Sequence, residues 1–188
     1  MTANEIAVAV IAALESLGLE YMLVGSLASN LYGTPRSTGD ADFVIQAEDL
    51  DVKALSERLG ERFKVDPQAQ LDAITFATRW VVQCVGSEFV VDLFLIKSDE
   101  RSQTEFSRRR PGVLCGRRVW VLAAEDSVAI KLKWSRFGRA KDVEDVRNIL
   151  AVQGRSLDLA YLRANCQLDG TLELFDRLWN EEVESPIR

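Results

Sequence analysis

The order of the predicted elements constrains this fold more than any other feature of the sequence. Strand-like apolar runs alternate with helical patterns up to Ala123, and the chain has helical periodicity from Ala124 onward. This order is typical of an α+β core followed by a helical subdomain. We therefore expect a core over residues 1–123 and a C-terminal helical subdomain, packed on that core, over residues 124–188.

The individual elements follow from hydrophobic periodicity and from turn residues. The expected helices span residues 2–17, 27–32, 50–63, 101–109, 124–137, 140–153, 156–165 and 170–183. The expected strands span residues 21–24, 41–45, 73–83 and 88–96, and a hairpin is expected over residues 112–122.

Composition limits the class of protein. The 188 residues are 47% hydrophobic and 28% charged, which is ordinary for a globular protein. No apolar stretch is long enough to cross a bilayer, and the apolar run 6–14 lacks the basic start of a signal peptide, so we expect a soluble, cytoplasmic protein. The absence of histidine excludes histidine-based triads and histidine-ligated zinc. A net charge of -6 argues against a general electrostatic grip on nucleic acid but leaves room for a local basic patch.

Two aspartates at strand spacing are the first candidates for chemistry. Side chains alternate along a strand, so Asp40 and Asp42 project from one face and Ala41 from the other. Two carboxylates about 6–7 Å apart by this geometry suit shared coordination of a hard divalent cation through oxygen. The alternative is a charged strand entrance after a loop.

A strand-to-helix turn precedes this acidic pair. Gly25 lets the backbone pass close to a ligand, and Ser26 with the following amides offers hydrogen-bond donors to an anion. N-capping explains most isolated Gly-Ser pairs. The turn and the acidic pair together favour a phosphate site beside a metal site.

A third acid lies inside the apolar run 89–96. Burying the Asp92 carboxylate costs several kcal/mol unless something compensates it. A metal ion or a salt bridge to a buried arginine would supply that compensation. If this strand pairs beside the one that carries the first two acids, three carboxylates converge, as two-metal phosphoryl chemistry requires.

At these positions the sequence resembles the polymerase-beta-like nucleotidyltransferase superfamily. The shared pattern is a Gly-Ser turn, a short helix, the Asp-x-Asp pair and a distant strand aspartate, within roughly residues 20–150. The segments 36–42 and 138–145, with Lys131, are most similar to the minimal bacterial branch that includes abortive-infection toxins and antibiotic-modifying enzymes.

The resemblance implies a mixed β-sheet flanked by helices. It also implies magnesium-dependent transfer of a nucleoside monophosphate from an NTP to an acceptor hydroxyl, with release of pyrophosphate and with one or two Mg²⁺ ions. By the resemblance, Asp40 and Asp42 hold the metal, Asp92 binds metal or acts as general base, and Ser26 contacts the terminal phosphates. The acceptor, whether a small molecule, an RNA end or a protein side chain, stays open.

Three further residues are candidates for nucleotide binding. Arg36 and Thr38 flank the acidic pair, where a guanidinium can reach a triphosphate or neutralise the carboxylates. Lys131 adds a point charge if it faces the site. Lys133 points about 200° away around the same helix, so at most one of these two lysines faces the site. A solvated surface is the alternative for both.

One basic concentration occurs in this acidic chain. It is a solvated face or a site for an RNA or another anionic acceptor. Its members are Arg101, Arg108, Arg109, Arg110, Arg117 and Arg118. We expect the tryptophans to lie in the core rather than to serve as base-stacking platforms; they are Trp80, Trp120, Trp134 and Trp179.

Two other functional classes compete with the enzyme. The first is a non-catalytic nucleotidyltransferase-like module that binds a nucleotide or a partner protein, for example within a toxin-antitoxin pair. The second is an interaction protein whose acids are ion-paired. Binding of NTP without turnover would favour the first, and failure to bind both magnesium and NTP would favour the second.

Overall fold

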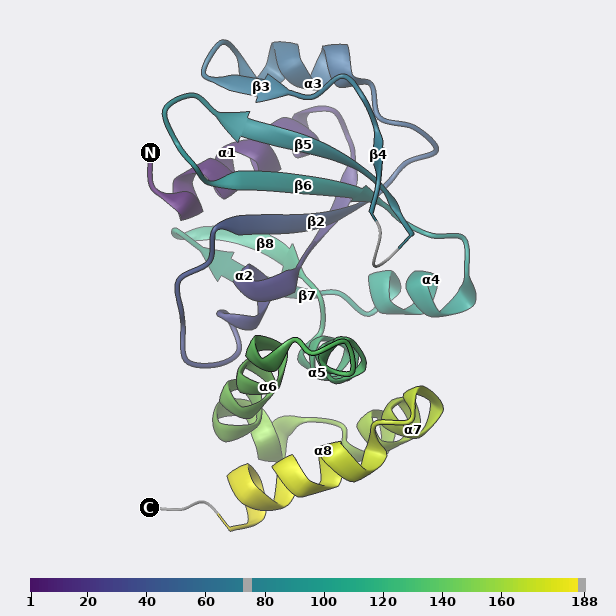
Figure 1. The fold of residues 1–188 in the computed structure, drawn as a ribbon. Coiled ribbons are helices and arrows are strands. Elements are labelled where there is room, and N and C mark those ends of the chain that lie inside the picture. Colours follow the sequence, from purple (N-terminus) through teal and green to yellow (C-terminus); the bar gives the residue numbers. More distant parts are fainter. Residues whose placement is uncertain (73–75, 186–188) are drawn as a thin grey trace. The chain divides into compact units, whose positions relative to one another are not determined.

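The computed structural model describes residues 1–72 and 76–185, whose helices and strands are shown in Figure 1. The strands form one sheet in the order β3-β5-β6-β2-β1-β8-β7, and β4 pairs with β5 beside this path. The strands are β1 (Glu20–Val24), β2 (Asp40–Gln46), β3 (Phe63–Val65), β4 (Gln70–Leu71), β5 (Thr78–Cys84), β6 (Val90–Leu95), β7 (Arg110–Leu114) and β8 (Arg117–Val121).

The sheet is mixed, as predicted. Strand β2 runs antiparallel to β1 and parallel to β6, while β8 runs parallel to β1 and antiparallel to β7. Helices flank the sheet, so the expected α+β class with a mixed sheet is confirmed.

The chain forms two compact units. The first consists of Met1–Leu27 and Ser37–Leu122, and the second of Ala28–Arg36 and Ala123–Arg188. The sheet belongs to the first unit together with α1 (Ala3–Ser16), α3 (Val52–Leu59) and α4 (Glu100–Ser107). The second unit contains α5 (Ala124–Ser135), α6 (Ala140–Gln153), α7 (Leu159–Asp169) and α8 (Leu172–Trp179). The short helix α2 (Gly25–Ser29) runs from the first unit into the second.

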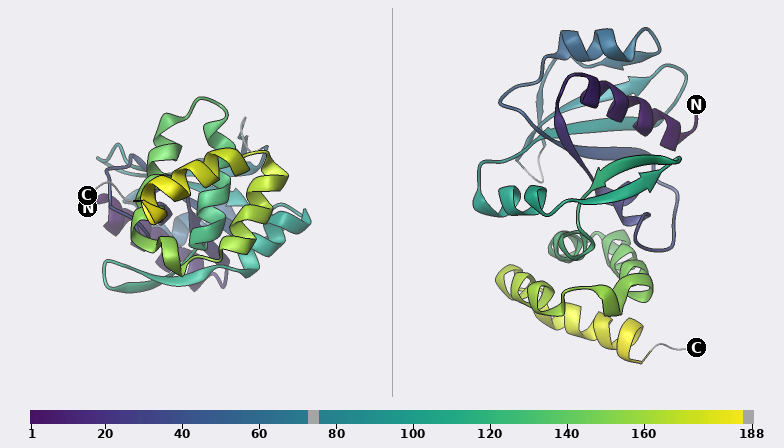
Figure 2. Two further views of the ribbon diagram at one scale, coloured as in Figure 1. Left: turned by 90° about the horizontal axis from the view of Figure 1, so that it is seen from below. Right: turned by 180° about the vertical axis from the view of Figure 1, so that it is seen from behind.

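One face of the sheet forms the core of the first unit. Alternate residues of the central strands point to this face and are fully buried, among them Phe43, Leu93 and Leu23. Helix α1 covers this face, as the rear view in Figure 2 shows, and buries an apolar stripe that includes Ile6 and Leu14. The opposite face therefore carries the alternate residues, and these include the acids of interest.

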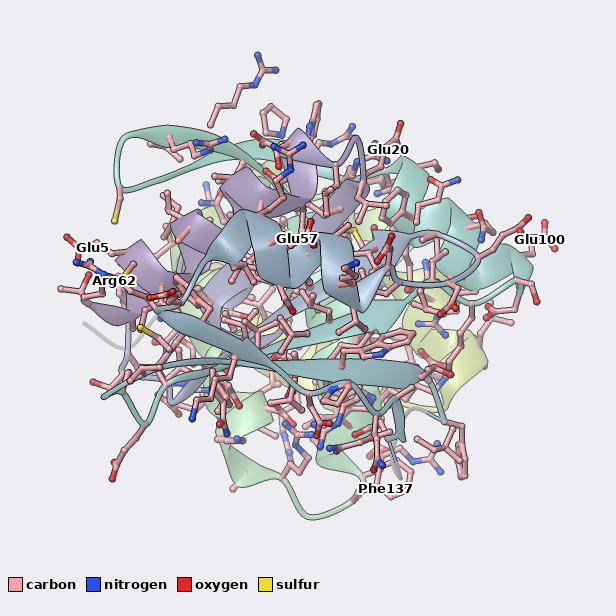
Figure 3. All side chains as sticks on the ribbon, turned by 90° about the horizontal axis from the view of Figure 1, so that it is seen from above. Glu5, Glu20, Glu57, Arg62, Glu100 and Phe137 are labelled. Carbon is pink, nitrogen blue, oxygen red and sulfur yellow. The ribbon has the colours of Figure 1, made fainter. Side chains whose placement is uncertain are left out.

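Local signals explain where the helices of the first unit begin and end. Helix α1 starts with a capping box in which Thr2 and Glu5 satisfy each other's backbone amides. Helix α3 begins after Asp51, whose side chain accepts from the Ala54 amide, so it starts two residues later than the expected helix 50–63. Its exposed face carries Glu57, seen from above in Figure 3.

The second unit is a group of helices around its own apolar core. Fully buried side chains such as Leu132, Ile149 and Phe175 come from different helices and pack together. The segment 28–36, expected within the core of residues 1–123, lies in this unit because Tyr32 packs against the same cluster. The Gln153 side-chain amide also donates to the Tyr32 carbonyl at 3.1 Å.

Several expected elements differ from the observed ones. Strands β3 and β4 were not predicted because they are only three and two residues long. The expected helix 170–183 is α8 followed by a π-helical turn, Asn180–Glu184. Residues 73–75 of the expected strand 73–83 lie outside the described residues, and the described part contains β5.

The prediction that the tryptophans lie in the core is wrong for Trp120. Trp120 is 38% exposed, whereas Trp80 is 4% exposed. The reason is strand alternation on β8, where Val119 and Val121 take the buried face and leave Trp120 on the open one. Across residues 1–72 and 76–185, no helix is both long and apolar enough to span a membrane.

Candidate active site

The pairing of β2 with β6 brings the three predicted acids onto one face of the sheet. The parallel register sets Asp42 directly opposite Asp92, and Asp40 lies one alternation earlier on the same strand face. Their neighbours Ala41, Val91 and Leu93 point to the buried face. The strand pairing on which convergence of the acids depended is therefore present.

The Gly-Ser turn lies beside this acidic face. Strand β1 is antiparallel to β2 and pairs Val24 with Asp42, so Gly25 follows immediately after the residue opposite that acid. Gly25 has φ +67, and a Cβ built on it would stand 2.0 Å from Asp42 Oδ2. Only glycine permits both this backbone conformation and this approach of a carboxylate. Ser26 is buried at the start of α2.

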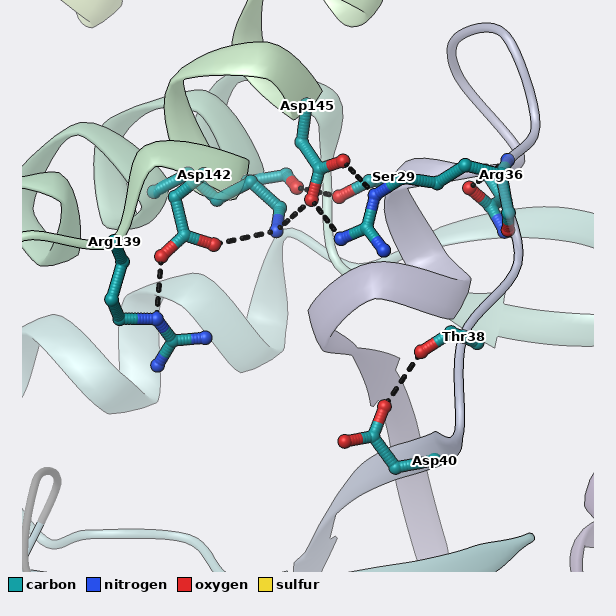
Figure 4. A network of polar contacts seen from close by, with 10 residues as sticks. Ser29, Arg36, Thr38, Asp40, Arg139, Asp142 and Asp145 are labelled. Carbon is teal, nitrogen blue, oxygen red and sulfur yellow. Dashed lines mark hydrogen bonds and ion pairs between the residues drawn. The ribbon is translucent and has the colours of Figure 1, made fainter.

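Thr38 positions the first acid of the pair. Its hydroxyl donates to Asp40 Oδ1 at 2.7 Å, as Figure 4 shows. Asp40 is partly exposed at the beginning of β2. Thr38 therefore holds the Asp40 carboxylate through a direct hydrogen bond. The sequence indicated only that the two residues are close in the chain.

Asp92 has an arginine as its counter-ion. Arg79 Nη1 donates to Asp92 Oδ2 at 3.0 Å, and Arg79 Nη2 reaches the Gln70 side-chain oxygen at 3.3 Å. Burial raises the pKa of Asp92 above its ordinary value; the Arg79 charge opposes this, and the nearby charge of Asp40 adds to it. The salt bridge that the sequence left as an alternative is thus formed. The Arg79 guanidinium favours the ionised form of this carboxylate.

Sequence reasoning missed Arg79. The signal that could have found it is strand parity, because Arg79 on β5 pairs with Phe94, two residues beyond Asp92 on β6 and on the same face. Its Nε atom is buried without a hydrogen-bond partner among the residues that the structure describes. Arg79 therefore lies on the acidic face and keeps one hydrogen-bond donor, Nε, that no described residue accepts from.

The chemistry of the acidic face fits a hard divalent cation only in part. Carboxylate oxygens are the ligands that Mg²⁺ prefers, and Asp40 and Asp42 supply them from adjacent positions on one face. Within residues 1–72 and 76–185, however, no group of three or more aspartate, glutamate or cysteine side chains is arranged to hold a metal ion. The pair on β2 therefore fits the cation, and Asp92 is engaged by Arg79.

The two cations that the sequence suggested for nucleotide binding, Arg36 and Lys131, meet in the second unit. Lys131 Nζ lies 2.7 Å from Asp145 Oδ2 and 3.3 Å from Asp142 Oδ1, and Arg36 lies with Nε 2.5 Å from Asp145 Oδ1 (Figure 4). Lys131, Asp142 and Asp145 are at least 97% buried. Arg139 completes the network, with Nε 2.7 Å from Asp142 Oδ2. The nucleotide-binding role of Arg36 and Lys131 stays a prediction, because both already have carboxylate partners.

The charges of this network lower the pKa of Asp145. Burial raises the pKa of Asp145, but hydrogen bonds and charge from Arg36 and Lys131 outweigh burial, so its pKa lies below the ordinary value. Lys133 points elsewhere, is about half exposed and pairs with Asp169 at 3.3 Å. Of the two lysines, only Lys131 is therefore buried and held in place by ion pairs.

Comparison with known proteins identifies the fold. No family model matches the sequence, and no curated protein sequence matches it. The solution structure of the antibiotic-resistance factor ANT(2'')-Ia is similar with a TM-score of 0.62 at 13% identity, over 93% of this chain and 95% of that chain.

Two further solved structures give the same result. The crystal structure of ANT(2")-Ia in complex with adenylyl-2"-tobramycin has a TM-score of 0.61 at 15% identity, over 89% of this chain and 99% of that chain. An antigenic nucleotidyltransferase-like protein from Paracoccidioides brasiliensis has a TM-score of 0.51 at 17% identity, over 94% of this chain and 92% of that chain. The chain therefore has the nucleotidyltransferase fold, which confirms the fold that the resemblance implied.

Proposed function

We propose that this protein is a magnesium-dependent nucleotidyltransferase that transfers a nucleoside monophosphate from an NTP to an acceptor hydroxyl and releases pyrophosphate. The observation that carries the proposal is the strand register, which sets Asp42 between Val24 on one side and Asp92 on the other. Gly25 lies against the Asp42 carboxylate in the same place. A phosphate-binding turn and paired carboxylates thus adjoin within a nucleotidyltransferase fold.

The residues on the acidic face have separate tasks. Asp40 and Asp42 hold Mg²⁺, which would neutralise phosphate charge and stabilise the leaving pyrophosphate. Thr38 fixes the orientation of Asp40 through its 2.7 Å hydrogen bond. Gly25 and Ser26 offer backbone and hydroxyl donors to the phosphates. Catalysis then consists mainly of positioning and charge stabilisation for in-line attack on the α-phosphate.

Asp92 is the acid whose role depends on its surroundings. It accepts the proton of the acceptor hydroxyl or completes the metal site. A general base must be ionised, and the Arg79 guanidinium 3.0 Å away favours that form against burial and the charge of Asp40. Burial outweighs the Arg79 charge, so the pKa of Asp92 lies above its ordinary value, and Arg79 limits that rise.

The experiment that tests the proposal measures transfer of a label from the α-phosphate of an NTP to an acceptor. Purified protein is incubated with each α-labelled NTP, Mg²⁺ and a cell extract, and the labelled product is identified. Transfer is expected from the wild type and is abolished by Asp42→Asn. The matched control is Glu57→Gln, which removes one charge from an exposed position on α3. Equal transfer by the Asp42 variant and the control would overturn the proposal.

One observation favours a second function, that of a non-catalytic nucleotide-binding module. Arg79 occupies Asp92, and no three-carboxylate metal group is assembled within the described part of the chain. Calorimetry with NTP and Mg²⁺ separates the two functions. Binding of NTP without pyrophosphate release in any extract would favour the module, which binds a nucleotide or a partner protein, over the enzyme.

A further inference from the structure

The hairpin β7–β8 lies at one edge of the sheet, as Figures 1 and 2 show. The parallel register pairs Leu23 with Val121, and both side chains are buried on the core face. Trp120, next to Val121, therefore points to the opposite face. Val24, next to Leu23, points to that face as well, and so does its partner Asp42. Strand β8 is two strands from β2, about 10 Å across the sheet.

An aromatic and arginine cluster covers this end of the face. The Arg109 guanidinium lies 4.3 Å from the Phe106 ring centroid and 5.4 Å from that of Trp120. The Arg118 guanidinium lies 5.6 Å from the Trp120 centroid. Trp120 remains 38% exposed, although its neighbours on β8 are buried. We call Arg109, Arg118 and Trp120 the hairpin platform.

The hairpin platform lies in a segment whose charge is opposite to that of the chain. Residues 106–122 contain five arginines and neither aspartate nor glutamate, in a chain of net charge -6. Arg109 is balanced by Glu20, 2.7 Å away. Arg118 lies on the same face of β8 as Trp120, is exposed and has no carboxylate partner in residues 1–72 and 76–185. Excess positive charge therefore collects around an exposed indole ring.

We propose that the hairpin platform binds single-stranded RNA. An exposed indole offers a stacking surface to any nucleobase, and the Arg118 guanidinium beside it offers charge to the phosphates that follow. An acidic peptide would satisfy the arginines but not the indole, and a duplex would present no free base faces. Duplex and peptide are therefore weaker ligands.

The shared face connects this surface with the proposed chemistry. If the protein is a nucleotidyltransferase, a strand held at the hairpin platform lies on the face that carries Asp42 and can present a terminal hydroxyl to it. This acceptor role rests on the proposed function, whereas the binding itself does not. RNA is thus the acceptor class that the surface favours.

The test measures binding without NTP or Mg²⁺. Fluorescence anisotropy of a labelled twelve-nucleotide single-stranded RNA is titrated with the wild-type protein, with Trp120→Leu and with Arg118→Glu. Loss of stacking is expected to weaken binding by at least about fivefold, and charge reversal should also reduce the dependence of affinity on salt. Arg155→Glu is the matched control, because Arg155 is exposed in the second unit, and it should bind as the wild type does.

Three results would overturn the proposal. They are undetectable binding by the wild type, equal binding by the platform variants and the control, and equal or tighter binding of poly-glutamate or of the RNA duplex. The last result would assign the surface to a protein partner or to polyanions in general. Asp42→Asn should bind RNA as the wild type does, so failure of nucleotide transfer with RNA binding intact counts against the proposed function alone.

Discussion

Replacing Gly25 by alanine separates the role of the turn from its contribution to stability. Gly25 and Gly18 have nearly the same backbone conformation, with φ +67 and φ +70. Alanine in this left-handed region costs about 1–2 kcal/mol, partly offset by about 0.4–1 kcal/mol from a less flexible unfolded chain. Both variants should therefore lose roughly 1 kcal/mol from the backbone alone.

The surroundings of the two glycines differ. A Cβ at Gly18 meets nothing within 4 Å, whereas a Cβ at Gly25 stands 2.0 Å from Asp42 Oδ2. The carboxylate must retreat by about 1 Å to reach a tolerable contact, and such a displacement of a catalytic group reduces turnover by about 100-fold. Gly25→Ala should therefore lose activity far beyond its loss of stability.

The assay compares urea unfolding with pyrophosphate release at saturating NTP and Mg²⁺, in the cell extract that supplies the acceptor. Gly18→Ala is expected to unfold more easily and to turn over like the wild type. Gly25→Ala is expected to unfold at least as easily and to be nearly inactive. If both variants kept the same turnover, the close approach of Gly25 to Asp42 would have no part in the site.

Three further perturbations probe the buried charges. Lys131→Ala should destabilise the fold by about 1.5–3 kcal/mol, because it removes one of the two cationic partners of each of the buried carboxylates Asp142 and Asp145. The half-exposed Lys133→Ala should lose less than about 1 kcal/mol in the same urea titration. The pKa of Asp145 is lowered in the fold, so its ionised form contributes stability above the ordinary value of 3.8, and this contribution is lost as the pH falls through the lowered pKa. Asp145→Asn should therefore be less stable than the wild type at pH 7, and the difference in unfolding free energy should shrink as the pH falls below 3.8. Arg79→Ala should lose about 1–3 kcal/mol but much less in an Asp92→Asn background, and equal losses in both backgrounds would show that the 3.0 Å ion pair contributes nothing.

The central part of the site could be predicted from the sequence because its signals are local. The period of a strand puts Asp40 and Asp42 on one face without knowledge of the fold. The Gly-Ser turn is a local backbone requirement, and the positive φ of Gly25 agrees with it. The side-chain roles of these residues in binding nucleotide and metal stay predictions.

The rest depended on pairings between distant segments. Arg79 reaches Asp92 only because β5 and β6 are neighbours in one particular register. Arg36 and Lys131 meet on Asp145, which is more than a hundred residues from Arg36 in the chain. A sequence pattern contains no information of this kind, because register and helix packing are set by the whole core.

The position of Trp120 shows the same limit. Tryptophan is usually buried, and composition favoured the core for all of them. Which face of β8 is open depends on its pairing with β1, through Leu23 and Val121. Once that register is known, the exposed ring follows from simple alternation.

The measurement that tests the central claim most directly compares two labels of the same NTP. The nucleotide is labelled on the α-phosphate in one reaction and on the γ-phosphate in the other, with Mg²⁺ and the acceptor identified from the extract. Nucleotidyl transfer predicts that the α label appears on the acceptor and the γ label in pyrophosphate, and that both signals vanish in Asp42→Asn. A γ label on the acceptor, or an α label that never leaves free nucleotide, would contradict the account.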